Sequence, residues 1–280
     1  MQNFNLAIVG GGNMASAMVR GLIVKGFVAS NILVVEKELL KAEELKKKYS
    51  IKIRNKIDNS INEYDLVLLA TKPQDLNLVC KNLSEVLDFQ NPPGFISIAA
   101  GVLIQDINIG LTDNQEQNLS IVRVMPNTPA AIGKGISAGF ANQYCKQIIR
   151  DFTQIIFQAV GEFLWIDNED DLNAITAISG SGPAYFYYFC ECLAHAGIEL
   201  GLTKEIAYKL AINTMIGTSK LIELSDESIT DLRQKVTSKG GTTEKAIDSL
   251  KKSLPEIVKK ATLTAKNQSE FLSKKEMNKI

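Results

Sequence analysis

The chain has 280 residues, of which 45% are hydrophobic and 22% are charged. These values are ordinary for a globular protein of one or two domains, and they exclude the disordered and fibrous classes. Lys+Arg and Asp+Glu number 31 each, so the net charge is zero and no nucleic-acid or anionic-membrane partner is expected.

Metal-ligating and redox residues are sparse. The four cysteines (Cys80, Cys145, Cys190 and Cys192) are scattered, and no pair has the spacing of a metal site. A single histidine, His195, nearly excludes a zinc site or a serine-type triad. The N-terminus resembles neither a signal peptide nor a membrane span. We therefore expect a cytoplasmic protein without a metal site.

The first half of the chain alternates short apolar runs with helical segments. Strand-sized apolar runs lie at 5–9, 32–35, 66–70, 95–99, 121–124, 136–140 and 162–166. Helical segments follow the first two runs, over 13–25 and up to about residue 49. This alternation predicts an α/β fold with a doubly wound parallel sheet covered on both faces, which we place at residues 1–165.

Beyond Asp167 the pattern is helical throughout. Long helices are expected over 183–200, 204–224 and 254–272, so residues 166–280 are predicted to form an all-helical domain. The segment 184–198 is apolar around most of its circumference, and a helix of that kind must be buried. A domain of about 110 residues would struggle to bury it alone, so we expect burial against a second subunit.

A glycine-rich motif follows the first predicted strand. The residues Gly10-Gly11-Gly12-Asn13-Met14-Ala15 match G-x-G-x-x-A between a strand and a helix. Gly10 permits the tight turn, Gly12 lets the backbone approach a pyrophosphate, and the helix N-terminus supplies amide donors. The motif predicts binding of a dinucleotide.

The end of the second predicted strand bears on which dinucleotide is bound. Glu36 is expected to accept hydrogen bonds from the adenosine ribose, which favours NAD because a 2′-phosphate would be repelled. Lys37 and Lys41 could instead pair with that phosphate, or form an ordinary solvated helix face. The sequence leaves the choice between NADH and NADPH open.

Loops after later strands should face the same ligand, because ligands lie beyond the carboxyl ends of parallel strands. The further cofactor-binding candidates are Ala70, Thr71, Lys72, Pro73, Ala99, Ala100 and Gly101. The loop Arg123–Pro129 is either a rigid turn between two prolines or part of the nicotinamide and substrate pocket, with Asn127 as the candidate.

Two small-residue segments lie in the helical half. Ser179–Pro183 suits a helix cap, and its small residues also allow a ligand near the backbone, with Ser181 as the candidate. Thr237–Thr243 places glycines and hydroxyls at a helix N-terminus, where they offer donors to a carboxylate or simply cap the helix.

Together these motifs resemble the pyrroline-5-carboxylate reductase family over nearly the whole chain. Thr237–Thr243 is the most specific segment, although Lys239 stands where the family usually has proline. The resemblance implies a Rossmann domain followed by a helical dimerisation domain, in a homodimer often assembled into a decamer. It also implies reduction of L-1-pyrroline-5-carboxylate to L-proline with NADPH or NADH.

By the family's pattern, substrate would be bound by Asp226, Ser238, Gly240, Gly241, Thr242 and Thr243. Thr243 is the candidate catalytic residue, through a hydrogen bond to the ring nitrogen. One alternative is a β-hydroxyacid dehydrogenase, but segment 184–197 lacks the lysine which that family carries on the corresponding helix. The other alternative is a dinucleotide-binding regulator without turnover, which would not need the Thr237–Thr243 loop.

Overall fold

The computed structural model describes residues 4–112 and 117–277, and it divides the chain into two compact units. Unit 1 comprises residues 1–181 and 265–280, and unit 2 comprises residues 182–264. This division differs from the boundary expected after residue 165. Helix α6 (Asp171–Ile175) contacts strands of the sheet, and Ser269 donates a 2.7 Å hydrogen bond to Asn173. These contacts join residues 166–181 and the end of the chain to the sheet.

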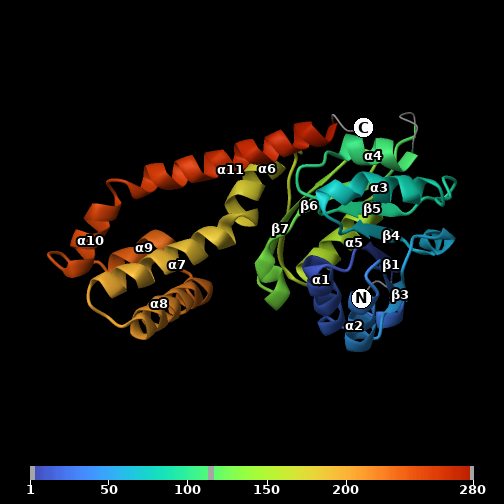
Figure 1. Cartoon of the computed structure of the whole chain (residues 1–280). Coiled ribbons are helices and arrows are strands. Elements are labelled where there is room, and N and C mark those ends of the chain that lie inside the picture. The colour runs from blue at the N-terminus through green and yellow to red at the C-terminus, as the bar shows by residue number, and fades with distance from the viewer. Residues whose placement is uncertain (1–3, 113–116, 278–280) are drawn as a thin grey trace. The chain divides into compact units, whose positions relative to one another are not determined.

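Unit 1 is built on one eight-stranded sheet (Figure 1). Its strands are β1 (Leu6–Val9), β2 (Ile32–Val35), β3 (Lys52–Arg54), β4 (Leu66–Leu69), β5 (Gly94–Ser97), β6 (Ile121–Met125), β7 (Gly135–Ala141) and β8 (Gly161–Trp165). The strand order is β3-β2-β1-β4-β5-β6-β7-β8, and every neighbouring pair is parallel except β6 and β7. The predicted parallel α/β sheet is confirmed.

Helices cover both faces of this sheet (Figure 1). They are α1 (Asn13–Val24), α2 (Leu39–Tyr49), α3 (Pro73–Ser84), α4 (Ile104–Thr112) and α5 (Gln147–Gln158). Side chains alternate along β1, so that Leu6 and Ile8 join a core with α1, α2 and α5, whereas Ala7 and Val9 join a core with α3 and α4. Two buried faces explain why β1, β2 and β4 are apolar at every position.

All seven expected strands are present, and the structure adds β3. That strand has the sequence Lys52-Ile53-Arg54 and lies at the edge of the sheet, with both charged residues exposed. A three-residue edge strand needs no apolar run, so its sequence carries no periodic signal.

Short helical turns complete unit 1. Three are 3₁₀ turns, and η4 is a π-helical turn; they are η1 (Ala29–Asn31), η2 (Asn59–Glu63), η3 (Thr128–Ile132) and η4 (Thr176–Gly180). The π-turn is closed by a 2.8 Å hydrogen bond from the Ser181 amide to the Thr176 carbonyl.

Unit 2 is helical. Its helices are α7 (Gly182–Glu199), α8 (Lys204–Leu224), α9 (Ile229–Lys235), α10 (Thr242–Leu250) and the first part of α11 (Leu254–Met277). Helices α7 and α8 pack against each other, but their shared core consists of Cys190, Ala194 and Ala211, all small residues.

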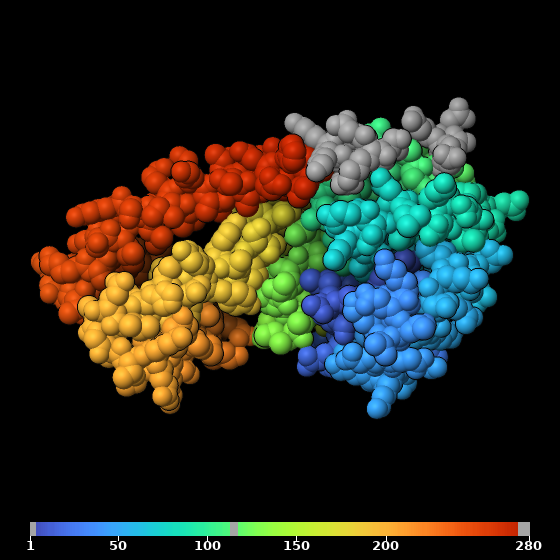
Figure 2. All heavy atoms as spheres, viewed as in Figure 1, coloured from blue at the N-terminus to red at the C-terminus, as the bar shows by residue number. Residues whose placement is uncertain are grey.

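Large apolar side chains of unit 2 lie at its surface. On α7 these are Phe186, Tyr187, Tyr188, Phe189 and Leu193, each between 46% and 68% exposed, and α8 adds several leucines and isoleucines. In Figure 2 the amber to orange spheres of these helices lie at the visible surface of unit 2. A surface of this kind is typical of a helix that is covered by a partner. Within the described residues, no helix is long and apolar enough to cross a membrane.

Candidate active site

The glycine loop joins β1 to α1, and its glycines differ in their surroundings. Gly10 has φ +103°, and a Cβ atom there would lie 2.7 Å from the Ala70 carbonyl oxygen. Gly12 caps α1 without a side-chain hydrogen bond, and a Cβ atom there would meet nothing within 4 Å. The loop therefore packs closely against Ala70, just after β4, at Gly10. At Gly12 it leaves open space in front of the α1 N-terminus. Free amides at a helix N-terminus favour an anion.

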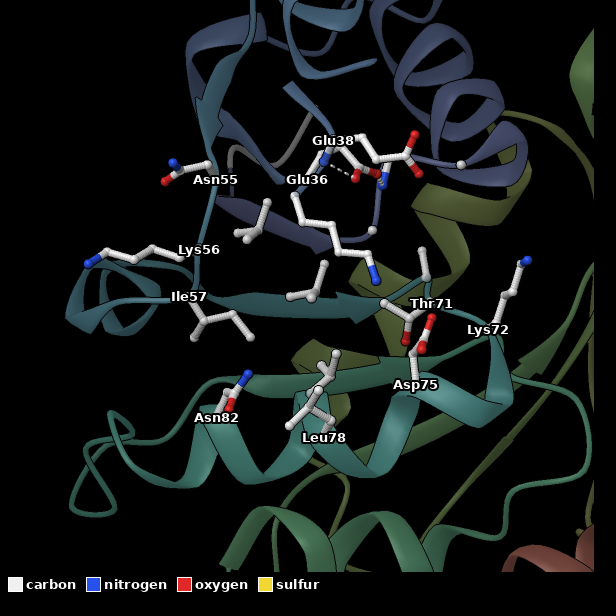
Figure 3. Close-up of a pocket in the computed structure, with 18 of the residues that line it drawn as sticks. Glu36, Glu38, Asn55, Lys56, Ile57, Thr71, Lys72, Asp75, Leu78 and Asn82 are labelled. Atoms are coloured by element: carbon white, nitrogen blue, oxygen red, sulfur yellow. Dashed lines mark hydrogen bonds between the residues drawn. The ribbon is translucent and has the colours of Figure 1, made fainter. Parts of the chain in front are cut away.

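A pocket of about 630 Å³ opens at the carboxyl ends of β1, β2 and β4 (Figure 3). It brings together the predicted cofactor residues Gly10, Gly11, Gly12, Glu36, Lys37, Ala70, Thr71 and Lys72. Sequence reasoning missed Asn55, Lys56 and Ile57, which follow the unpredicted strand β3, and Leu78 and Asn82 on α3. Because β3 was not predicted, the sequence did not indicate that residues 55–57 line this pocket.

The other predicted cofactor residues do not line the pocket. They are Asn13, Met14, Pro73, Ala99, Ala100 and Gly101. Asn13 is exposed in the first turn of α1, and Met14 packs against the core. Gly101 has φ +77°, and a Cβ atom there would lie 3.2 Å from Cβ of Leu272 on α11. The loop after β5 therefore packs against the end of the chain.

The Glu36 carboxylate is buried and held by two backbone amides. Oε2 accepts a 2.8 Å hydrogen bond from Gly11, and Oε1 accepts one of 2.8 Å from Glu38. The Glu36 residue is 8% exposed. A Cβ atom at Gly11 would lie 2.9 Å from Oε2, so Gly11 makes room for this carboxylate.

The pocket fits a dinucleotide on three observations of this structure. Space is open at Gly12, the α1 amides lack a side-chain cap, and the buried hydroxyl of Thr71 has no hydrogen-bond partner within the described chain. A buried hydroxyl without a partner is costly unless a ligand or water satisfies it. Together they provide an anion site and a polar contact on one wall.

The Asn127 side chain is hydrogen-bonded to the main chain at both ends of its amide. Its Oδ1 accepts a 2.9 Å hydrogen bond from Ile136, and its Nδ2 donates one of 3.2 Å to the Ser179 carbonyl. The side chain is thus used to fasten the β6–β7 loop to the π-turn η4, just before Ser181. Each end of the amide keeps one further donor or acceptor position, so a contact between Asn127 and substrate stays a prediction.

A buried ion pair lies between β6 and the segment leading into α6. Arg123 donates to Oε1 of Glu169 at 2.6 Å, and the same oxygen accepts a 2.9 Å hydrogen bond from the Ile104 amide. The side chains are 7% and 23% exposed. Asp106 lies in the same region, and burial raises the pKa of its carboxyl group above the usual range. The pair holds the start of α4 in place.

The Thr237–Thr243 loop belongs to unit 2 and leads into α10. Gly240 has φ +76°, its amide donates to Oε2 of Glu244 at 2.8 Å, and the Gly241 amide donates to the Ser238 carbonyl at 3.0 Å. Gly241 caps α10 without a side-chain hydrogen bond, so no capping side chain binds the Thr242 and Thr243 amides at the start of this helix. Sequence reasoning stopped at Thr243 and missed Glu244, although its place four residues after Gly240 suits such a contact.

Asp226 and Lys239 contribute less to this loop. Asp226 is exposed in the turn between α8 and α9, and no described hydrogen bond or ion pair joins it to Thr237–Thr243. Lys239 is exposed in the loop. Among the described residues, no group of three or more His, Cys, Asp or Glu side chains is arranged to hold a metal ion.

Two family models match the chain in succession. One described as NADP oxidoreductase coenzyme F420-dependent matches residues 5–122, and one described as pyrroline-5-carboxylate reductase dimerisation matches residues 169–272. The pyrroline-5-carboxylate reductase of Pasteurella multocida is 37% identical over 279 residues, covering 98% of this chain and 99% of that protein.

Solved structures agree with these matches. A pyrroline-5-carboxylate reductase from Coxiella burnetii is similar at a TM-score of 0.88 and 37% identity, over 97% of this chain and 99% of that one. The Plasmodium falciparum pyrroline carboxylate reductase with NADP bound has a TM-score of 0.80 and 28% identity, over 98% and 99%. The likeness therefore extends over both units.

Proposed function

Since the chain belongs to the pyrroline-5-carboxylate reductase family, we propose that it reduces L-1-pyrroline-5-carboxylate to L-proline with NADH or NADPH. The observation that carries this proposal is the near-full-length similarity to pyrroline-5-carboxylate reductases, which includes both the dinucleotide pocket and the Thr237–Thr243 loop. A bound reduced nicotinamide supplies the hydride that reduces the C=N bond.

The residues of unit 1 bind and orient the dinucleotide. The α1 amides behind Gly12 would hold the pyrophosphate, because they combine unpaired donors with the positive end of the helix dipole. Thr71 would donate its unpartnered hydroxyl to the bound cofactor. These contacts would orient the bound cofactor, and orientation is the main contribution that such a reduction needs from the protein.

The residues of unit 2 would bind the substrate. The amides of Thr242 and Thr243 are suited to its carboxylate, and the Thr243 hydroxyl to its ring nitrogen. Ser238 and Glu244 act on the loop itself, since they engage the Gly241 and Gly240 amides. A cyclic imine is readily protonated, so hydroxyl and amide donors suffice without a strong enzymic acid.

We further propose that the chain works as a homodimer. The support is the matched dimerisation family model and the exposed aromatic surface of α7, which a second copy would cover. One chain has a mass of 30.7 kDa, so light scattering would give about 61 kDa for the dimer and about 307 kDa for a decamer. A stable, active monomer would contradict both. A cytoplasmic location is also proposed, supported by four free cysteines.

The enzymatic proposal is tested by the absorbance of reduced nicotinamide. The purified chain should oxidise NADH or NADPH only when pyrroline-5-carboxylate is added, and proline should appear in equal amount. If the chain binds the dinucleotides but pyrroline-5-carboxylate causes no oxidation of either one, the proposal is wrong.

A further inference from the structure

The carboxylate of Glu36 is fixed in one position. It accepts hydrogen bonds of 2.8 Å from the amides of Gly11 and Glu38, one on each oxygen. Hydrogen bonds from amides to a carboxylate are short and strong because the acceptor is ionised. With Glu36 8% exposed, the carboxylate has little freedom to swing away from an incoming group.

This carboxylate lies where the adenosine ribose is expected. Glu36 directly follows β2 and lines the pocket beside the glycine loop (Figure 3). In sheets of this type, an acidic residue at that position accepts hydrogen bonds from the ribose 2′-hydroxyl. Each carboxylate oxygen has a further lone pair available after accepting one amide. The same oxygens would face a 2′-phosphate if NADPH were bound.

Lys41 offsets this charge only in part. Its hydrogen bond to Glu38 raises the pKa of its ammonium group, and the nearby Glu36 carboxylate contributes less. Lys41 is bound to Glu38 at 2.7 Å, and within the described chain no lysine or arginine forms an ion pair with Glu36. Figure 3 shows Lys56 and Lys72 on opposite sides of the pocket, with Glu36 between them. Lys37 is exposed, so water screens its charge.

Arginine, the side chain that best matches a phosphate, is absent from the described lining of this pocket. Of the two interpretations that the sequence left open, binding of a ribose by Glu36 therefore has more support than binding of a 2′-phosphate by Lys37 and Lys41. The acidic residue is buried and held by the backbone, whereas Lys41 is engaged with another carboxylate and Lys37 is solvated.

We propose that Glu36 makes this chain select NADH over NADPH. The inference rests on the proposed function for the identity of the cofactor, and it adds which of the two dinucleotides the site accepts. Its basis is a buried carboxylate that can bind two ribose hydroxyls and that repels a phosphate at the same place.

The test is calorimetric titration of the full-length chain with NADH and with NADPH, without substrate. We expect the Kd for NADPH to exceed that for NADH by at least about tenfold. Glu36→Gln keeps the shape of the side chain and removes its charge, so it should lower this ratio by about tenfold. Glu44→Gln, an exposed position on α2 outside the pocket, makes the same change in net charge and should leave the ratio unaltered.

Circular dichroism and thermal melting check that each variant folds, and Glu36→Ser serves if Glu36→Gln does not. Should both fail, adenosine 2′,5′-bisphosphate and adenosine 5′-monophosphate are compared on the wild-type chain, where the 2′-phosphate should weaken binding. The proposal is overturned if NADPH binds the wild-type chain as tightly as NADH, or if the ratio survives in the folded Glu36 variants. Turnover with NADPH would then still support the reductase function, so the two failures are distinguishable.

Discussion

Replacing Gly10 and Gly12 with alanine, one at a time, should separate stability from cofactor binding. At Gly10 an alanine would have to adopt φ +103°, with its Cβ atom 2.7 Å from the Ala70 carbonyl oxygen. Such backbone strain costs about 1–3 kcal/mol, and the collision adds to it. A loss of about 3 kcal/mol would lower the Tm by roughly 6 °C or more.

At Gly12 the expectation is reversed. Its φ of −70° is open to any residue, and a Cβ atom there meets nothing within 4 Å. The free energy of unfolding should therefore change by less than about 1 kcal/mol, the usual cost of alanine at a helix N-cap. The new methyl group would instead occupy the approach to the α1 amides. Loss of two hydrogen bonds to an anion, each worth about 1.5 kcal/mol or more, weakens binding by about two orders of magnitude.

Both variants are measured by thermal melting at one protein concentration and by calorimetric titration with NADH. Gly12→Ala should melt like the wild type and bind weakly, and Gly10→Ala should melt early. If Gly12→Ala binds NADH within about threefold of the wild type, the pyrophosphate does not pass Gly12, and the placement of the cofactor is wrong.

Three further predictions concern other parts of the chain. Thr243→Val should raise the KM for pyrroline-5-carboxylate about tenfold and leave the KM for the dinucleotide unchanged. The control variant Thr262→Val should change neither KM. If Thr243→Val has wild-type kinetics, Thr243 is only a helix cap. Glu169→Ala leaves the 7% exposed Arg123 side chain without its carboxylate and should lower the free energy of unfolding by about 3 kcal/mol. The double variant Arg123→Met/Glu169→Leu should recover most of that loss in thermal melts, and equal melting of the single and double variants would disprove the coupling. Burial raises the folded-state pKa of Asp106 above its unfolded value, so its ionised form opposes folding above that pKa, and this opposition disappears as the pH falls below the unfolded value. Asp106→Asn should therefore raise the Tm more at about pH 8 than at about pH 3, and an equal gain at both would refute this.

The sequence predicted the elements that have a strong apolar pattern. Every buried strand of the sheet was visible as an apolar run, because both of its faces are covered by helices. The edge strand β3 carries two exposed charges and was invisible, and with it the contribution of Asn55–Ile57 to the pocket. Pattern reasoning detects burial, and it misses chain segments that are held mainly by backbone hydrogen bonds.

The site shows a similar limit. The glycine motif predicted the loop at the end of β1, but not that Gly11 makes room for the Glu36 carboxylate. The loop with Asn127 was either a rigid turn or part of the substrate pocket, and the sequence did not show that Asn127 bonds to the main chains of Ile136 and Ser179. A sequence motif identifies which residue types gather near a ligand. It does not tell which of their atoms are already bonded within the protein.

The end of the chain belongs to the same unit as its beginning. Residues 265–277 complete unit 1, where Leu272 approaches Gly101 and Ser269 bonds to Asn173. During synthesis these residues leave the ribosome after all of unit 2 has emerged. A nascent chain therefore cannot complete unit 1 before unit 2 has been synthesised, and a product that stops at residue 264 would lack part of unit 1 while retaining unit 2. Loss of the residues after 264 would therefore destabilise the sheet of unit 1, although its strands lie more than about a hundred residues earlier in the sequence.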